Sequence, residues 1–145
     1  FSSVELSLSP ENTLVIKAPL VCDDILQTND IARIYPDGSF TILGRKDNVI
    51  NSGGIKIQAE EIEKVLRPFI PMPFVITSVP DPRLGQAVTL LIEGQLDMEE
   101  LKNKVQEILP PYNRPKYIRM VDFIPQTGNG KINRVECRTL AEKLL

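Results

Sequence analysis

Hydrophobic and polar residues alternate in short runs along the first third of the chain. A run with apolar side chains at every second position is typical of a β-strand that is buried on one face. Two of the runs flank Pro36-Asp37-Gly38, where proline fixes φ and glycine accepts a positive φ, so they are predicted to form a hairpin. The predicted strands cover residues 4–8, 13–18, 31–35 and 39–43. No helix is predicted among them, and this stretch therefore reads as part of a β domain.

After residue 46 the pattern changes to a mixture of strands and helices. A second hairpin is predicted over 47–57, with Ser52-Gly53-Gly54 at its tip, and a helix follows over 58–69. Asp97 and Asn133 each have a glutamate three positions later, which is typical of a residue that caps the start of a helix. The remaining predicted strands cover 74–79, 87–92 and 116–124. The order β-β-α-β-β-α-β-α indicates an α+β fold, in which a β-hairpin and a short mixed sheet are flanked by helices.

Helical spacing predicts which side of each helix is buried. In the first helix the apolar face consists of Ala59, Ile62, Val65, Leu66 and Phe69. The charged residues around them, Glu60, Glu61, Glu63 and Lys64, read as a solvent-exposed face. The predicted buried faces of the other two helices are Met98, Leu101, Val105 and Ile108, and Cys137, Leu140, Ala141 and Leu144.

The composition excludes several classes of protein. The 145 residues are 42% hydrophobic and 25% charged, which is too apolar for a disordered chain. No apolar run reaches the roughly 18 residues that a membrane span requires. The formal net charge of −2 argues against a nucleic-acid partner, because domains that bind the phosphate backbone are usually basic. The absence of histidine excludes a histidine-based triad and a zinc site with histidine ligands, and no metal site is predicted.

The cysteines and the start of the chain indicate where the protein acts. Cys22 and Cys137 are the only cysteines and are predicted to be free thiols in a reducing compartment, the cytoplasm. The chain begins Phe1-Ser2-Ser3, without the basic and apolar segments of a signal peptide. We therefore expect this start to be a cut inside a longer protein.

Loops that contain glycine carry the candidate chemistry. In the loop over 125–131 two glycines allow a tight bend that presents Lys131 as a compact cation. Taken alone, Lys131 reads as an ordinary surface lysine, and the loop is not a P-loop because the Gly-x4-Gly-Lys-Ser/Thr pattern is missing and Ile132 follows the lysine. Asp30, at a predicted strand start, offers a carboxylate for the diol of a ribose, or is an ordinary turn residue. Gly44-Arg45-Lys46-Asp47, taken alone, is a charged linker.

Together and in this order, four motifs closely resemble the adenylate-forming enzymes. They are Thr28-Asn29-Asp30; Gly44-Arg45-x-Asp47-x-x-Ile50-x-x-Gly53-Gly54-x-x-Ile57-x-x-Glu60-Glu61-Ile62-Glu63; Val79-Pro80-Asp81; and Pro125-x-Thr127-x-x-Gly130-Lys131-Ile132-x-Arg134. This superfamily includes acyl- and aryl-CoA synthetases, adenylation domains of nonribosomal peptide synthetases and beetle luciferases. The resemblance implies that a carboxylate attacks the α-phosphate of ATP to give an acyl-adenylate and pyrophosphate, and that a thiol, usually that of CoA, then displaces AMP.

The resemblance also implies a division into domains and a set of roles. Residues 1–46 are similar to the end of a large N-terminal domain, and residues 47–145 to a mobile C-terminal domain. Lys131 resembles the lysine that offsets charge on the phosphates during adenylation. Asp30 and Arg45 resemble the contacts to the ribose of ATP. Mg²⁺ would be bound mainly by the N-terminal domain, which these 145 residues do not include, and we expect this chain alone to have no ligase activity.

Other residues match the second half-reaction. Asp47 resembles the hinge residue about which the C-terminal domain rotates. Gly53 and Gly54 resemble the loop that leaves room for the pantetheine arm of CoA. Three basic residues are possible contacts to the phosphate of CoA: Arg114, Lys116 and Arg119. With Tyr112 and Tyr117 nearby, the same cluster is also compatible with a nucleic-acid module.

The acid substrate cannot be deduced, because the acyl pocket of the family lies in the large domain. The segment from Arg45 to Glu63 is most similar to bacterial o-succinylbenzoate–CoA ligases of menaquinone biosynthesis. Another acyl- or aryl-CoA synthetase and an adenylation domain that loads a carrier protein remain alternatives. A further alternative is not an enzyme but an α+β module that docks another chain through the hairpin at Ser52-Gly53-Gly54.

Overall fold

The computed structural model describes residues 5–17 and 25–145, and it divides the chain into two compact units, Phe1–Asp47 and Asn48–Leu145. The division falls one residue after the predicted boundary. Cys22 and the predicted strand ends Val4 and Ala18 lie outside the described residues.

The first unit is a four-stranded antiparallel sheet. Its strands are β1 (Glu5–Leu8), β2 (Thr13–Lys17), β3 (Ile25–Ile34) and β4 (Phe40–Arg45), paired in that order. β3 and β4 form the predicted hairpin, with Gly38 at a φ of +90° in its turn. β3 is longer than expected, so Asp30 lies inside a strand and not at the start of one.

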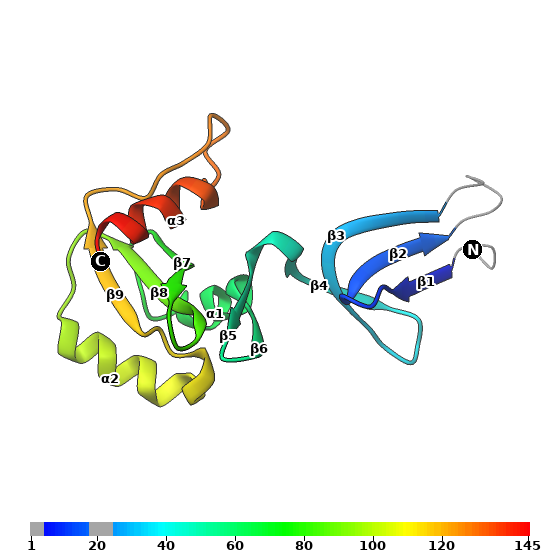
Figure 1. Cartoon of the computed structure of the whole chain (residues 1–145), viewed down its shortest axis with the longest axis horizontal. Coiled ribbons are helices and arrows are strands. Elements are labelled where there is room, and N and C mark those ends of the chain that lie inside the picture. Colours follow the sequence, from blue (N-terminus) through cyan, green and yellow to red (C-terminus); the bar gives the residue numbers. More distant parts are fainter. Residues whose placement is uncertain (1–4, 18–24) are drawn as a thin grey trace. The chain divides into compact units, whose positions relative to one another are not determined.

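The second unit has the predicted order of strands and α-helices. These elements are β5 (Val49–Ser52), β6 (Ile55–Gln58), α1 (Ala59–Leu66), β7 (Phe74–Asp81), β8 (Gly85–Glu93), α2 (Met98–Ile108), β9 (Tyr117–Val121) and α3 (Arg134–Lys143). Two short 3-10 helices accompany them: η1 (Lys46–Asn48), at the boundary between the units, and η2 (Pro111–Asn113). The sheet order is β6-β5-β8-β7, and β9 pairs with β8 in parallel, which makes the sheet mixed as expected (Figure 1). The α+β fold class is therefore confirmed.

The helices cover both faces of this sheet. α1 and α2 pack on one face, in a core that includes Ile62, Leu66, Leu90 and Leu101. α3 packs on the other face, where Cys137 and Ala141 contact Val75 and Leu91. Because helices cover both faces, β7 and β8 are buried along almost their whole length.

Two predicted buried faces differ from the structure. α1 ends at Leu66, and Val65 and Phe69 are exposed, whereas Glu63 is buried. The face that packs on the sheet consists of Ala59, Ile62, Glu63 and Leu66, which have the i, i+3, i+4, i+7 spacing of a single stripe. Val65 lies outside that stripe. In α3, Leu144 is exposed, because it follows the last residue of the helix.

The two predicted helix caps are confirmed. The Asp97 carboxylate accepts hydrogen bonds from the amides of Glu99 and Glu100, and the Asn133 side chain accepts one from the amide of Glu136. Each bond satisfies a donor that the first turn of a helix leaves unpaired. In the described part of the chain, no helix combines the length and the apolar character that a membrane crossing demands.

Candidate functional site

Lys131 lies in a narrow hairpin that projects beyond α3 (the orange loop in Figure 1). Gln126 and Ile132 form a single antiparallel bridge, and the Thr127 amide donates to the Lys131 carbonyl at 2.7 Å. The turn is closed by the Gly130 amide, which donates to the Thr127 carbonyl at 3.0 Å, and Gly130 has a φ of +78° that favours glycine. The Lys131 side chain is exposed. Among the residues that the structure describes, Lys131 forms no ion pair.

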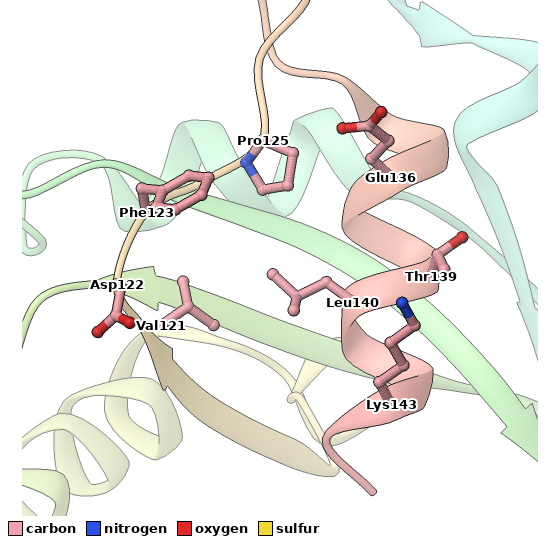
Figure 2. A pocket seen from close by; sticks show the side chains of 8 residues that line it. All are labelled: Val121, Asp122, Phe123, Pro125, Glu136, Thr139, Leu140 and Lys143. Atoms are coloured by element: carbon pink, nitrogen blue, oxygen red, sulfur yellow. The ribbon is translucent and has the colours of Figure 1, made fainter.

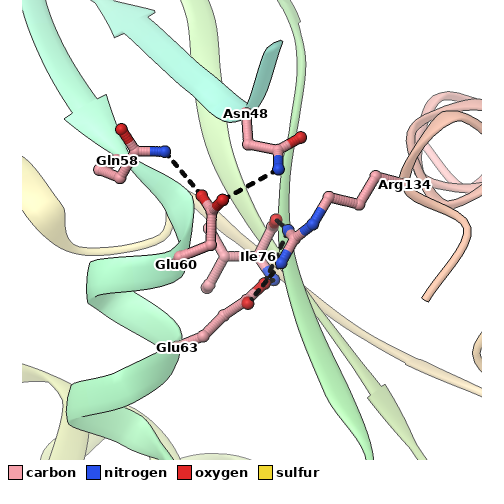
Figure 3. Close-up of polar contacts among 6 residues, drawn as sticks. All are labelled: Asn48, Gln58, Glu60, Glu63, Ile76 and Arg134. Carbon is pink, nitrogen blue, oxygen red and sulfur yellow. Dashed lines mark hydrogen bonds and ion pairs between the residues drawn. The ribbon is translucent and has the colours of Figure 1, made fainter. Parts of the chain in front are cut away.

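The C-terminal end of this hairpin is fixed by an ion pair between the partly buried Arg134 and the buried Glu63 (Figure 3). Arg134 is the first residue of α3, and its guanidinium donates to both carboxylate oxygens of Glu63, at 2.7 Å to Oε1 and 3.0 Å to Oε2. Glu63 Oε2 also accepts the amide of Ile76 in β7 at 2.8 Å. Glu63 is buried, so the prediction that it lies on a solvent-exposed face of α1 is wrong. Its position in the buried stripe of α1 is the signal that could have found it.

Gly53 and Gly54 form the tip of the β5–β6 hairpin, which Figure 1 shows well separated from the Lys131 loop. Their φ values are +59° and +84°, in the left-handed region. The Gly53 amide donates to the Leu84 carbonyl at 2.8 Å, and a Cβ at Gly53 would lie 3.3 Å from the end of the Leu84 side chain. A Cβ at Gly54 would meet no atom within 4 Å outside the adjacent residues. The tip therefore presents bare backbone on its outer side.

Asp81 holds the turn that contains Leu84. Its side chain is 1% exposed; Oδ1 accepts the amides of Arg83 and Leu84, and Oδ2 accepts the Lys116 ammonium at 2.5 Å. The hydrogen bond from Lys116, followed by those from the amides of Leu84 and Arg83, lowers the pKa of Asp81 to about 2. The same hydrogen bond raises the pKa of Lys116. Asp81 thus stabilises the segment on which the tip of the β5–β6 hairpin rests.

The three predicted phosphate contacts line one cavity of about 310 Å³ with Lys102 of α2. Arg114 donates to the carbonyls of Leu109 at 3.0 Å and of Gln106 at 2.9 Å, and so caps the end of α2. Arg119 donates to a backbone carbonyl at 3.0 Å. Lys116 is paired with Asp81. The structure brings these cations together, but each of the three predicted residues already has a partner within the chain.

Asp30 and Arg45 face each other across β3 and β4 in the first unit. They are paired in the register of the two strands, and Arg45 Nη1 lies 3.0 Å from Asp30 Oδ1. Both side chains are partly exposed. Asp47 is exposed in η1, next to the division between the two units.

A separate cavity of about 480 Å³ lies between the end of β9 and α3 (Figure 2). Its wall combines the apolar side chains of Val121, Phe123 and Leu140 with the charged groups of Asp122 and Lys143. None of the predicted site residues lines it. In the described ranges, 5–17 and 25–145, no three acidic or cysteine side chains gather closely enough to hold a metal ion.

The comparisons with known proteins agree with this architecture. Residues 74–131 match the family of the AMP-binding enzyme C-terminal domain. The chain is 33% identical over 116 residues to 2-succinylbenzoate–CoA ligase of Lactococcus lactis, an alignment that covers 77% of this chain and 25% of that protein. It is 37% identical over 132 residues to the mitochondrial malonate–CoA ligase of Bos taurus, which covers 86% of this chain and 22% of that protein. The chain thus spans about a quarter of the length of these two relatives.

A solved structure extends the match to both units. The acyl-CoA synthetase (AMP-forming)/AMP-acid ligase II-like protein of Dyadobacter fermentans superposes with a TM-score of 0.61 at 29% identity, over 93% of this chain and 41% of that one. From these matches and the α+β architecture, we conclude that the second unit contains the AMP-binding C-terminal domain of the adenylate-forming superfamily.

Proposed function

We propose that this chain is the C-terminal part of an ATP-dependent acid–CoA ligase. In the first step an acid carboxylate attacks the α-phosphorus of ATP, and the bond to pyrophosphate breaks. In the second step the sulfur of CoA attacks the acyl carbon of the adenylate, and AMP leaves with the electrons of the broken C–O bond. The family match of residues 74–131 supports this assignment, and the exposed Lys131 hairpin is the observation that carries it.

Lys131 acts in the adenylation step. Two anions, the carboxylate and the triphosphate, must approach each other, and negative charge develops on the transferring phosphoryl group. A preplaced ammonium in a site from which water is excluded offsets this charge, and removal of one such contact costs about 3–4 kcal/mol in the transition state. A lysine on a hairpin that extends from its domain can enter the active site of a second domain, which in this proposal is a large N-terminal domain.

Gly53 and Gly54 act in the thioester-forming step. Their bare backbone leaves a passage for the pantetheine arm of CoA when the C-terminal domain has rotated about Asp47. The cavity lined by Lys102, Arg114 and Arg119 offers positive charge for the phosphates of CoA. In the proposed division into residues 1–46 and 47–145, the second domain rotates, and Asp47 at its start is the hinge.

Asp30 and Arg45 bind the ribose of ATP in this proposal. A vicinal diol donates two hydrogen bonds to a carboxylate, and Asp30 is partly exposed. The Arg45 guanidinium, 3.0 Å from Asp30, orients that carboxylate toward the ribose.

For the acid we propose o-succinylbenzoate, the substrate of ligases in menaquinone biosynthesis. The similarity to a 2-succinylbenzoate–CoA ligase supports it, and the similarity to a malonate–CoA ligase keeps other acids as candidates. An adenylation domain that loads a carrier protein is the other alternative. It would transfer the acyl group to a thiol on that protein instead of to CoA. A cytoplasmic location is part of the same proposal, whereas four of the relatives are mitochondrial.

The test compares two lysine variants of the complete enzyme that carries this chain. Lys131→Ala is expected to lower acid-dependent ATP–pyrophosphate exchange by about 100-fold or more, while thioester formation from supplied acyl-adenylate is mostly retained. Lys64→Ala, at an exposed position on α1, is the matched control and is expected to leave both steps unchanged. Equal loss of both steps in Lys131→Ala, or full retention of exchange, would reject the role of Lys131. Exchange with a panel of aromatic and aliphatic acids tests the substrate.

A further inference from the structure

The ion pair between Glu63 and Arg134 connects three elements that are distant in sequence. Glu63 lies in α1, Ile76 in β7 and Arg134 at the start of α3 (Figure 3). The carboxylate accepts both guanidinium bonds and the Ile76 amide, so it has three donors, and its side chain is 4% exposed. Arg134 Nη1 additionally lies 3.4 Å from the Ile76 carbonyl. A bidentate pair of this kind fixes both the distance and the plane of the guanidinium.

This pair is attached directly to the Lys131 hairpin. Only Ile132 and Asn133 separate Lys131 from Arg134, and the Asn133 amide donates to the Pro125 carbonyl at 2.9 Å, where the hairpin begins. Both ends of the hairpin therefore meet at the residue that precedes Arg134. The orientation of the hairpin follows from where Arg134 is held.

Helix α1, which carries Glu63, is also attached to the segment next to the proposed hinge. The Asn48 side-chain amide donates to Glu60 Oε2 at 3.0 Å, and that of Gln58 donates to Glu60 Oε1 at 2.7 Å. Asn48 directly follows Asp47, and Glu60 precedes Glu63 by three residues on α1. One turn of α1 thus contacts both the residue after the proposed hinge and the residue that ends the Lys131 hairpin.

We propose that Glu63 and Arg134 are positioning residues, which hold the Lys131 hairpin in a fixed orientation relative to the hinge through α1. This inference rests on the proposed function of Lys131. An ammonium stabilises a developing charge only when it is held in place before the reaction, and an error of about 1 Å can reduce a rate by about 100-fold. A hairpin that carries an exposed lysine gains this precision from the ion pair at its base.

The first test measures the hairpin itself and does not depend on catalysis. Native-state hydrogen exchange in the full chain is followed at the hydrogen-bonded amides of Thr127, Gly130 and Asn133. Arg134→Gln is expected to accelerate their exchange by about tenfold or more relative to amides of β7 and β8. Arg138→Gln is the matched control, because Arg138 lies one turn later on α3, is exposed, and forms no ion pair with any described residue.

A double variant guards against loss of folding. Arg134→Gln alone leaves Glu63 charged and buried, whereas Glu63→Gln with Arg134→Gln removes both charges and keeps an oxygen that accepts the Ile76 amide. The double variant is expected to fold and to show the same accelerated exchange in the hairpin. Unchanged exchange at all three amides in the double variant would overturn the proposal.

The second test uses the complete enzyme. In the double variant, kcat for ATP–pyrophosphate exchange is expected to fall about 10- to 100-fold with little change in the KM for ATP, while thioester formation from supplied adenylate is retained. In the single variant Arg134→Lys, kcat is expected to lie between the values of the double variant and the wild type, because an ammonium cannot form the bidentate contact with Glu63. Faster hairpin exchange with full adenylation activity would overturn the positioning role. A wild-type enzyme without acid-dependent exchange would reject the proposed function instead, and the hydrogen-exchange result would stand separately.

Discussion

At the tip of the β5–β6 hairpin, the effect of backbone strain on stability can be separated from the effect of a side-chain contact. At Gly53 the φ of +59° is close to that of an ideal left-handed residue, which costs an L-amino acid about 1–2 kcal/mol. The added Cβ would also lie 3.3 Å from Leu84 Cδ2. Because this atom is the end of a flexible side chain, a small movement relieves the contact. We therefore expect Gly53→Ala to lower the free energy of unfolding of the second unit by about 1–2 kcal/mol, nearly all of it from the backbone.

Two further variants test that division. Gly54→Ala carries the same kind of strain, at a φ of +84°, but its Cβ meets nothing within 4 Å, so it should cost about as much as Gly53→Ala. Gly53→Asn places a larger side chain at the crowded position, but asparagine tolerates the left-handed region. It should therefore cost clearly less than Gly53→Ala.

Urea unfolding followed by the helical circular-dichroism signal is the appropriate assay, since every helix in the described ranges except part of η1 lies in the second unit. With a slope of about 1.5 kcal/mol per molar, a loss of 1.5 kcal/mol moves the midpoint by about 1 M. If Gly53→Asn is as destabilising as Gly53→Ala, and Gly54→Ala is harmless, contact with Leu84 dominates and the backbone argument is wrong.

Three other properties can be measured directly. Since the pKa of Asp81 is lowered to about 2 in the folded state, its contribution to stability is present above pH ~4 and lost as the pH falls toward about 2; Asp81→Asn should flatten this part of the stability curve. Burial raises the pKa of the Cys137 thiol to about 11. In a Cys22→Ser background, a thiol reagent at about pH 8 should therefore react slowly with Cys137 until urea unfolds the second unit. Rapid labelling of the native chain would contradict this. In the complete enzyme, Asp47→Pro fixes φ and should slow one half-reaction much more than the other, whereas equal slowing of both would argue against a hinge there.

Features that depend on neighbours in sequence could be predicted well. The caps at Asp97 and Asn133 and the turn at Gly38 follow from residues within a few positions, and the structure has all three. The order of strands and helices in the second unit follows from hydrophobic periodicity in the same way. The start of β3 was not predicted: the strand begins at Ile25, six residues before the predicted start at Ile31.

Ion pairs between residues that are distant in sequence could not be predicted. Periodicity suggested that Val65 belongs to the buried face of α1 because it is apolar, and that Glu63 is exposed because it is charged. The structure buries Glu63 because Arg134, 71 residues later, neutralises it. Likewise, the ion pair between Lys116 and Asp81, which are 35 residues apart, could not be predicted from the basic cluster at 114–119, and the contact of that cluster with CoA stays a prediction.

Both candidate loops depend on the same strand, and this decides which variants are informative. The Lys131 hairpin is anchored through Glu63 to Ile76 in β7, and the Gly53 tip is anchored through Leu84 to the turn that Asp81 holds at the end of β7. A substitution that disrupts β7 itself would therefore disturb both loops and reveal nothing about either step. A change at Arg134 alters one anchor, and a change at Asp81 alters the other, so the two half-reactions should respond separately. A ligase in which either change slowed both steps equally would require a coupling between the loops that these contacts do not supply.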